Sequence, residues 1–413
     1  MEIEQIIKDL RNNNIEKFDN EFIKDIEIYK KDLIDNLKNN ISLKELYLLC
    51  DDFNEKELND ISEIFKCNNS LTKLYLCDGN YYNINKFIDN LKYNNSLIEL
   101  EISSFKLEEI INELYEYIEN NNKLNKLILY DNEIKDIEYL CEILKDNNTL
   151  MFIDLSTNRI NNINNLNCLK YNSTLTELNL TDNGINNING LCEGLKYNSS
   201  LTNLNLSYNK IKDINELGNS LKINNTLTEI NLEYNEIENI DNLGKSLKYN
   251  KSLIYLNLDY NDIKNIDKLC ESLKYNSILS SLYLCDNEIE NIDILGENLK
   301  YNNSLMNLDL SMNDIIYINK LNEGLKYNSS LTYLKLNSNK FKDLDIIGDC
   351  LKYNSSLITL DISYNYSSFN KLYEGLKYNS SLTKLFILNN YNNDKLLDIL
   401  NYNFTLTFIN NKY

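Results

Sequence analysis

The chain of 413 residues contains no histidine, proline or tryptophan, and its only arginines are Arg11 and Arg159. Histidine is the commonest general base and the commonest metal ligand, so its absence removes Ser-His and Cys-His catalytic pairs and histidine-containing metal sites. The ten glycines form no glycine-rich phosphate loop. We therefore expect that the protein is not an enzyme and that it holds no cofactor and no metal.

Positive charge is also scarce, because 62 acidic residues face 42 basic ones and the net charge is −20. Nucleic-acid binding depends on basic residues that neutralise phosphates, so this composition argues against it. The first ten residues, MEIEQIIKDL, lack the basic and apolar regions of a secretory signal. No apolar run approaches the roughly 20 residues of a membrane span. We therefore expect a cytoplasmic protein that binds neither nucleic acid nor a membrane.

The nine cysteines are scattered, odd in number and free of any CxxC motif. This pattern predicts reduced thiols that fill small apolar spaces, and it fits neither disulfides nor metal ligands. Asparagine makes up roughly a fifth of the chain, a bias that often accompanies disorder. Here asparagine alternates with leucine and isoleucine at fixed intervals, which favours folded structure.

A nine-residue pattern, LxxLxLxxN, recurs along most of the chain. Its first leucine returns every 25 or 26 residues, at Leu124, Leu150, Leu175, Leu201, Leu227, Leu253, Leu279, Leu305, Leu331, Leu357 and Leu382. Weaker copies begin at Leu43, Leu71 and Leu97, and a truncated copy lies near Leu406. Such a period predicts a solenoid in which each unit buries its apolar face against its neighbours. We assign residues 1–42 to an N-terminal helical cap and residues 43–413 to about 14 units plus the truncated one.

Each unit has a strand half and a helix half. In the stretch LTNLNLSYN, Leu204 and Leu206 alternate with polar residues, which predicts a short strand. The spacing of Ile211, Ile214, Leu217 and Leu221 then predicts one face of a helix. The strands of successive units should pair in parallel, with the helices on the opposite side.

The stretches LTNLNLSYNKI, LTEINLEYNEI and LSSLYLCDNEI resemble leucine-rich repeat proteins. The helix half, LCEGLKYNSSL, resembles the ribonuclease-inhibitor-like subclass, because small residues such as Cys192 and Gly194 separate its leucines. The resemblance implies an α/β solenoid shaped as a curved horseshoe, with parallel strands on the concave face and helices on the convex face. The unit is about two residues shorter than is common in that subclass, so we expect shorter helices.

Two asparagines recur in each unit. The resemblance implies that the last residue of the pattern, such as Asn235, points inward and bonds to the backbone, a role that suits its donors and acceptors. The second asparagine belongs to the repeated stretch LKYNSSLT, where we expect Asn198 to adopt a left-handed helix cap. Several of these asparagines start Asn-x-Ser/Thr motifs, and we interpret them as caps rather than glycan acceptors.

The candidate binding surface is the concave face, onto which alternate strand residues project. We expect a negative field with aromatic groups along it, which would suit a basic protein partner. The alternative is a solvated face of drifting polar residues in a duplicated scaffold. The candidate residues are Asp154, Glu177, Glu229, Glu233, Tyr255, Asp259, Tyr283, Asp309 and Tyr333.

Tyr208, Tyr234 and Tyr260 occupy the same position in three consecutive units, beside the concave face. Adjacent strands lie about 4.8 Å apart, so we predict that these rings stack. A stacking role is compatible with a second role in binding, and we include all three among the candidate residues.

These observations favour a non-catalytic, monomeric protein-interaction scaffold. One alternative is a regulator that activates a small GTPase, for which Arg159 is the only arginine in the repeats that could act as a finger. Another is the substrate-recognition subunit of a ubiquitin ligase, which would need a recruiting domain that residues 1–42 do not obviously supply.

Overall fold

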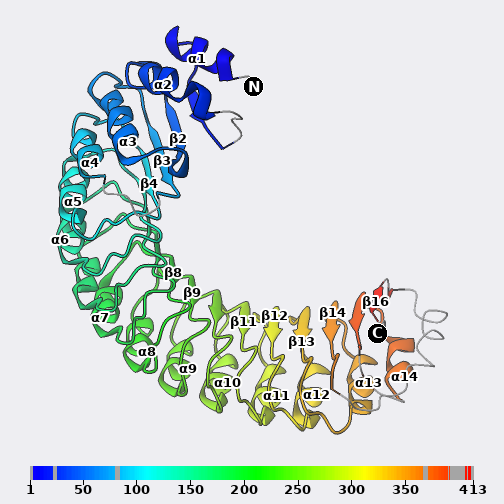
Figure 1. The fold of residues 1–413 in the computed structure, drawn as a ribbon. Helices are drawn as coiled ribbons and strands as arrows, with labels where there is room; N and C mark the ends of the chain where they lie inside the picture. The colour runs from blue at the N-terminus through cyan, green and yellow to red at the C-terminus, as the bar shows by residue number, and fades with distance from the viewer. Residues whose placement is uncertain are drawn as a thin grey trace. The chain divides into compact units, whose positions relative to one another are not determined.

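The computed structural model describes residues 3–21, 26–79, 84–365, 371–388, 390, 405–406 and 408–410, with the side chain of residue 373 and those of the last strand excepted. The chain divides into two compact units, residues 1–185 and residues 186–413. Figure 1 shows short strands alternating with helices along the chain in both. Each unit is described by itself below.

In residues 1–185 the strands pair in parallel and in sequence order, from β1 to β7. They are β1 (Lys17–Asp19), β2 (Glu45–Leu49), β3 (Lys73–Cys77), β4 (Glu99–Ile102), β5 (Lys126–Ile128), β6 (Phe152–Asp154) and β7 (Glu177–Asn179). The helices are α1 (Ile3–Arg11), α2 (Ile26–Leu37), α3 (Glu55–Ile61), α4 (Asn85–Leu91), α5 (Ile111–Asn120) and α6 (Glu138–Asp146), and the 3₁₀ turns are η1 (Cys50–Asp52), η2 (Ser62–Lys66) and η3 (Asn164–Lys170).

In residues 186–413 strands β8 to β16 also pair in parallel and in order. They are β8 (Asn203–Asn205), β9 (Glu229–Asn231), β10 (Tyr255–Asn257), β11 (Ser281–Tyr283), β12 (Asn307–Asp309), β13 (Tyr333–Lys335), β14 (Thr359–Asp361), β15 (Lys384–Phe386) and β16 (Phe408–Asn410). The helices are α7 (Asn189–Tyr197), α8 (Asn215–Leu221), α9 (Asp241–Leu247), α10 (Asp267–Leu273), α11 (Asp293–Leu299), α12 (Asn319–Leu325), α13 (Asp345–Leu351) and α14 (Leu372–Tyr378).

The helices of residues 186–413 lie along one side of this unit and the strands along the other (Figure 1). We call the sheet face directed away from the helices the open face, and the surface formed by the helices the outer surface. The predicted α/β repeat solenoid with parallel strands and helices on opposite sides is confirmed.

The repeated leucines and isoleucines form the core. In the unit that contains β8, the apolar side chains from Leu201 to Leu221 are all 2% exposed or less. Fully burying one such side chain stabilises the fold by about 1.5–3 kcal/mol. The helix itself is shorter than the sequence spacing suggested, because Ile211 and Ile214 lie in the connection before α8, where Asp213 forms a parallel bridge with Asn239.

The inner asparagines form the predicted ladder, which is confirmed. Asn235 is 8% exposed, and its amide donates to the carbonyls of Leu206 at 3.0 Å and Leu232 at 3.1 Å. Its Oδ1 atom accepts from the backbone N–H of Ile211 at 3.0 Å. One side chain thus joins backbone groups of two successive units, and without it the N–H of Ile211 would be buried without a partner.

The asparagines of the LKYNSSLT stretch form a second ladder, at the outer turn. Asn198 has φ −68° and ψ 138°, so the predicted left-handed cap is wrong. Its Oδ1 atom accepts from the N–H groups of Ser200 and Leu201 at the start of the next strand segment. In the following unit, the amide of Asn224 donates to the carbonyls of Leu195 and Asn198 at 2.8 and 3.2 Å. The residue therefore joins units instead of ending a helix in the left-handed region.

A left-handed residue does recur, but at the inner turn. The position directly before the inner asparagine has a positive φ in unit after unit: 52° at Thr157, 54° at Tyr208, 50° at Asp286 and 54° at Met312. This conformation directs the N–H of Tyr208 to the carbonyl of Glu233 in the next unit, at 2.9 Å. Residues other than glycine are strained here, and the sequence analysis missed the feature because the side chains at this position vary.

Residues 1–42 contain more than helices. Strand β1 pairs with β2, and Asn20 exchanges two hydrogen bonds with the backbone of Leu49. Asn20 thus links β1 to the following unit, whereas an inner asparagine such as Asn235 bonds to the preceding unit. All nine cysteines are free thiols, and six of them are buried. No helix in the described part of the chain is both long and apolar enough to cross a membrane.

Candidate functional site

The parallel register brings candidate side chains of residues 186–413 together on the open face. The first and third residues of each short strand carry side chains on this face, while the middle residue is buried. Tyr255 of β10 lies opposite Glu229 of β9 and Ser281 of β11. Tyr283 of β11 lies opposite Asp309 of β12. Neighbouring units therefore supply alternating aromatic and acidic groups to one surface.

Carboxylates gather along the line where the strands end. Burial is the main reason that the pKa of Asp259 is raised to about 7, and the negative charges of Asp309 and Glu233 contribute to the same shift. The N–H of Cys285 donates to Asp259 at 2.5 Å and, together with the charge of Lys335, offsets part of the shift. The carboxyl group of Asp259 therefore resists ionisation chiefly because it is shielded from water, and the neighbouring carboxylates add to the effect.

Asp309 itself does not present a free charge, contrary to the sequence-based expectation. It is 3% exposed, and its carboxylate accepts from the N–H and hydroxyl of Ser311. Lys335 of the next strand forms an ion pair with it at 3.0 Å. The physical reason is crowding between adjacent strands, which covers Asp309 and lets a lysine from the following unit reach it. Glu229 is exposed and Glu233 half-buried, and neither forms an ion pair among the described residues. Each accepts a hydrogen bond from an asparagine amide, that of Asn203 and that of Asn257.

Three half-buried tyrosines lie on the same surface. The rings of Tyr255 and Tyr283 have centroids 5.2 Å apart and planes tilted by 42°. The ammonium of Lys335 lies 5.6 Å from the ring centroid of Tyr333. Burial raises the pKa of Tyr255 to about 12, so its hydroxyl remains protonated and can donate a hydrogen bond. Such aromatic groups provide both apolar area and a polar atom for recognition.

The predicted stacking of Tyr208, Tyr234 and Tyr260 is confirmed. The first two rings have centroids 4.4 Å apart with planes 17° apart, and the second pair is 4.0 Å and 7° apart. All three residues occupy the left-handed position of the inner turn, with φ between 51° and 54°. Stacking compensates in part for that backbone conformation, so the ladder has a structural role beside any role in binding.

Two candidates, Asp154 and Glu177, belong to residues 1–185. Asp154 accepts from Ser156 through one oxygen and from the amide of Asn179 through the other, at 3.0 Å. Glu177 is exposed at the start of β7. The arginine considered as a catalytic finger, Arg159, forms an ion pair with Glu133 at 2.5 Å. Its engagement with a neighbouring unit gives it a structural role.

The sequence analysis missed an aromatic pair on the open face of residues 1–185. The rings of Tyr47 and Tyr75 stack with centroids 4.1 Å apart, and the ammonium of Lys17 lies 4.2 Å from the Tyr47 centroid. Burial, followed by a hydrogen bond to Glu99, raises the pKa of Tyr75. The signal was available, since both tyrosines occupy the same position in successive units.

The residues present do not form a metal centre: the described part of the chain has no cluster of three or more cysteine or carboxylate side chains placed to hold an ion. The repeats and the parallel register of their strands define a leucine-rich repeat fold, which is an α/β solenoid of parallel strands and helices. Two solved structures with this fold are similar to the chain. An internalin from Listeria monocytogenes has 21% sequence identity and a TM-score of 0.59, with 92% of this chain and 89% of that chain covered.

The leucine-rich repeat domain of APL1B has 18% identity and a TM-score of 0.50, with 71% of this chain and 76% of that chain covered. No protein-family model matches the sequence, and no curated protein matches it. At these identities the likeness concerns the fold.

Proposed function

We propose that the protein is a non-catalytic interaction scaffold that binds a basic protein segment on the open face of residues 186–413. The observation that carries this proposal is the register of β9 and β10, which sets Tyr255 opposite Glu229 on the open face, where Glu229 and Glu233 form no ion pair among the described residues. A lysine or arginine from a partner would pair with these carboxylates, and Tyr255 and Tyr283 would supply apolar contact area.

The proposal also covers the subclass of repeat, the cellular location and the oligomeric state. We place the chain in the ribonuclease-inhibitor-like subclass because each helix of residues 186–413 buries small side chains between its leucines, such as Cys192, Gly218 and Ser220. We propose that the protein acts as a cytoplasmic monomer, in keeping with its free cysteines. Residues 1–42 serve as a cap and residues 43–413 as the repeat array in this proposal.

The test compares two triple charge reversals in affinity capture from a cell extract. In the open-face variant, Glu229, Glu233 and Asp259 become lysine. In the matched control, the same charge change is made on the outer surface, at the exposed residues Glu297, Glu323 and Asp349. We expect the open-face variant to lose partners that wild type and control both retain. Recovery of the same partners by both variants would contradict the proposal.

A further inference from the structure

The outer surface of residues 186–413 carries a regular row of lysines. The residue after the last leucine of every helix from α7 to α14 is a lysine: Lys196, Lys222, Lys248, Lys274, Lys300, Lys326, Lys352 and Lys377. A lysine at a helix C-terminus complements the negative end of the helix dipole, which is a sufficient structural reason for the row. A tyrosine follows in every unit except one, where Ile223 replaces it. The row alone therefore indicates no ligand.

A second column changes the net charge beside the row from unit to unit. Two residues before the same leucine, six of the eight helices carry a carboxylate: Glu193, Glu271, Glu297, Glu323, Asp349 and Glu374. The exceptions are adjacent, Asn219 in α8 and Lys245 in α9. In these two units the carboxylate of the column is first removed and then replaced by a positive charge. Lys245 lies in the last turn of α9, where the helix dipole also favours it, so the break in the acidic column is what distinguishes this place.

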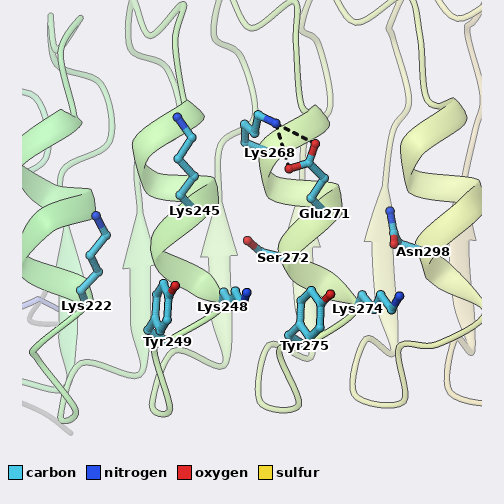
Figure 2. Close-up of a pocket in the computed structure, with 10 residues that line it drawn as sticks. All are labelled: Lys222, Lys245, Lys248, Tyr249, Lys268, Glu271, Ser272, Lys274, Tyr275 and Asn298. Carbon is cyan, nitrogen blue, oxygen red and sulfur yellow. Dashed lines mark hydrogen bonds and ion pairs between the residues drawn. The ribbon is translucent and has the colours of Figure 1, made fainter.

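The structure forms a groove at this place. A cavity of about 580 Å³ lies on the outer surface of helices α8 to α11, a volume typical of small-molecule sites. Figure 2 shows five lysines around it, with the rings of Tyr249 and Tyr275 beside Lys248 and Lys274. Its single carboxylate, Glu271, is bound to Lys268 at 2.7 Å. No ion pair involves Lys222, Lys245, Lys248 or Lys274 in the part of the chain that the structure describes.

The aromatic rings hold the lysines in place. The ammonium of Lys248 lies 4.5 Å from the Tyr275 centroid, and that of Lys274 lies 5.6 Å from the same centroid. Two ammonium groups therefore flank one exposed ring, and the cation–π contacts restrict both side chains. The hydroxyl of Ser272 lines the same groove, so neutral hydrogen-bond donors accompany the positive charges.

We infer that this groove binds a compact polyphosphate, with Lys222, Lys245, Lys248 and Lys274 contacting its oxygens. Size is the reason for choosing a compact ligand. The acidic column resumes at Glu193 in α7 and at Glu271 and Glu297 in α10 and α11, and the chain as a whole carries a charge of −20. Salt screens these charges beyond about 8–10 Å, so a small anion meets mainly the lysines. A long polyanion would extend over the carboxylates and be repelled. The site lies on the surface opposite the open face and is independent of the proposed function.

Calorimetric titration of the full chain with inorganic tripolyphosphate tests the inference. We expect saturable binding to wild type and at least tenfold weaker binding to Lys245→Glu, which restores the acidic column. The control is Lys352→Glu, an exposed lysine of the row outside the groove, which like Lys248 lies beside two tyrosines, Tyr353 and Tyr378. Its affinity should change less than twofold. Absence of saturable binding, or an equal loss in both variants, would overturn the inference.

Two further measurements complete the test. Because Lys245 is exposed, its variant should have the melting temperature of wild type, so a loss of binding cannot be attributed to unfolding. Phosphate groups also occur on lipids, and sedimentation with phosphatidylcholine vesicles that contain phosphatidylinositol bisphosphate distinguishes that source. We expect no sedimentation above that with phosphatidylcholine alone. Sedimentation with the bisphosphate vesicles, without binding of tripolyphosphate, would refute a free polyphosphate ligand.

Discussion

The open face and the outer surface of residues 186–413 are built on one repeating frame, yet they treat charge in opposite ways. On the open face, some acidic groups are buried: Asp309 is covered and paired with Lys335, and burial raises the pKa of Asp259. On the outer surface, Lys245 and Lys248 remain exposed beside a groove. The comparison teaches that the frame is set by asparagine and leucine, while the few residues that break a column give each surface its chemistry.

The largest effect should come from removing the frame that both surfaces share. Asn235→Ala would leave the N–H of Ile211 without its acceptor, while the carbonyls of Leu206 and Leu232 would each keep one other asparagine amide, at a cost of about 1–3 kcal/mol. Asn224→Ala at the outer turn should cost a similar amount, because it leaves the N–H groups of Thr226 and Leu227 without their acceptor. Denaturant unfolding measures both. An unchanged stability in either variant would mean that the corresponding ladder is dispensable.

A smaller effect concerns the pH dependence of the unfolding free energy, which should respond to a substitution on the open face and not to one on the outer surface. Asp259 has a folded-state pKa of about 7 against an ordinary value of 3.8, so the folded state binds the proton more tightly than the unfolded state. Stability must then fall as pH rises between these values, by about 1–2 kcal/mol after allowance for partial solvent exposure. Asp259→Asn keeps an acceptor for Cys285 and removes the titration.

The measurement is the difference in unfolding free energy between wild type and Asp259→Asn at pH 4.5 and pH 8. Relative to the variant, wild type should lose stability at the higher pH. The Lys245→Glu variant, altered on the outer surface, should follow the wild-type pH dependence. A wild type that gains stability relative to Asp259→Asn as pH rises would show that the carboxylate is stabilised, and not opposed, by its surroundings.

The smallest effect concerns the left-handed position that borders the open face. Met312 has φ 54° and is 43% exposed, so Met312→Gly should stabilise the chain by about 0.5–1 kcal/mol. Tyr234→Gly relieves the same strain but removes a ring that stacks on two others, so its net effect should be close to zero or destabilising. Thermal unfolding of the two variants separates strain from stacking. Equal stabilisation in both would indicate that the tyrosine ladder contributes nothing.

The fold was predictable because its determinants are local and repeated. The leucine at the start of each pattern, the alternation of Leu204 and Leu206, and the inner asparagine each specify one structural role, and the period specifies their stacking. The predictions were wrong where contacts with adjoining segments determine a residue's conformation or charge. Asn198 was assigned a cap from its place in one helix, whereas its partners belong to adjoining segments. Asp309 was expected to carry an unpaired charge, because its ion-pair partner Lys335 belongs to the next unit and is distant in the sequence.

The candidate residues were only partly predictable for the same reason. Alternation places Glu229 and Tyr255 on the open face, but the amount of free charge depends on contacts between strands. The outer groove could have been predicted from the sequence. Aligning the units shows that Lys245 stands where most helices carry a carboxylate, and this exception marks the position of the groove.

The central claim is that a basic partner docks on the open face, and carboxyl footprinting of the partner-bound chain tests it most directly. Labelling by a carbodiimide and glycine ethyl ester is compared for the free and bound chain at Glu229 and Glu233, with the exposed Glu297 and Glu323 as outer-surface references. The account predicts that the partner protects the first pair and leaves the second pair unchanged. Protection of Glu297 and Glu323 with full labelling of Glu229 and Glu233 would contradict it.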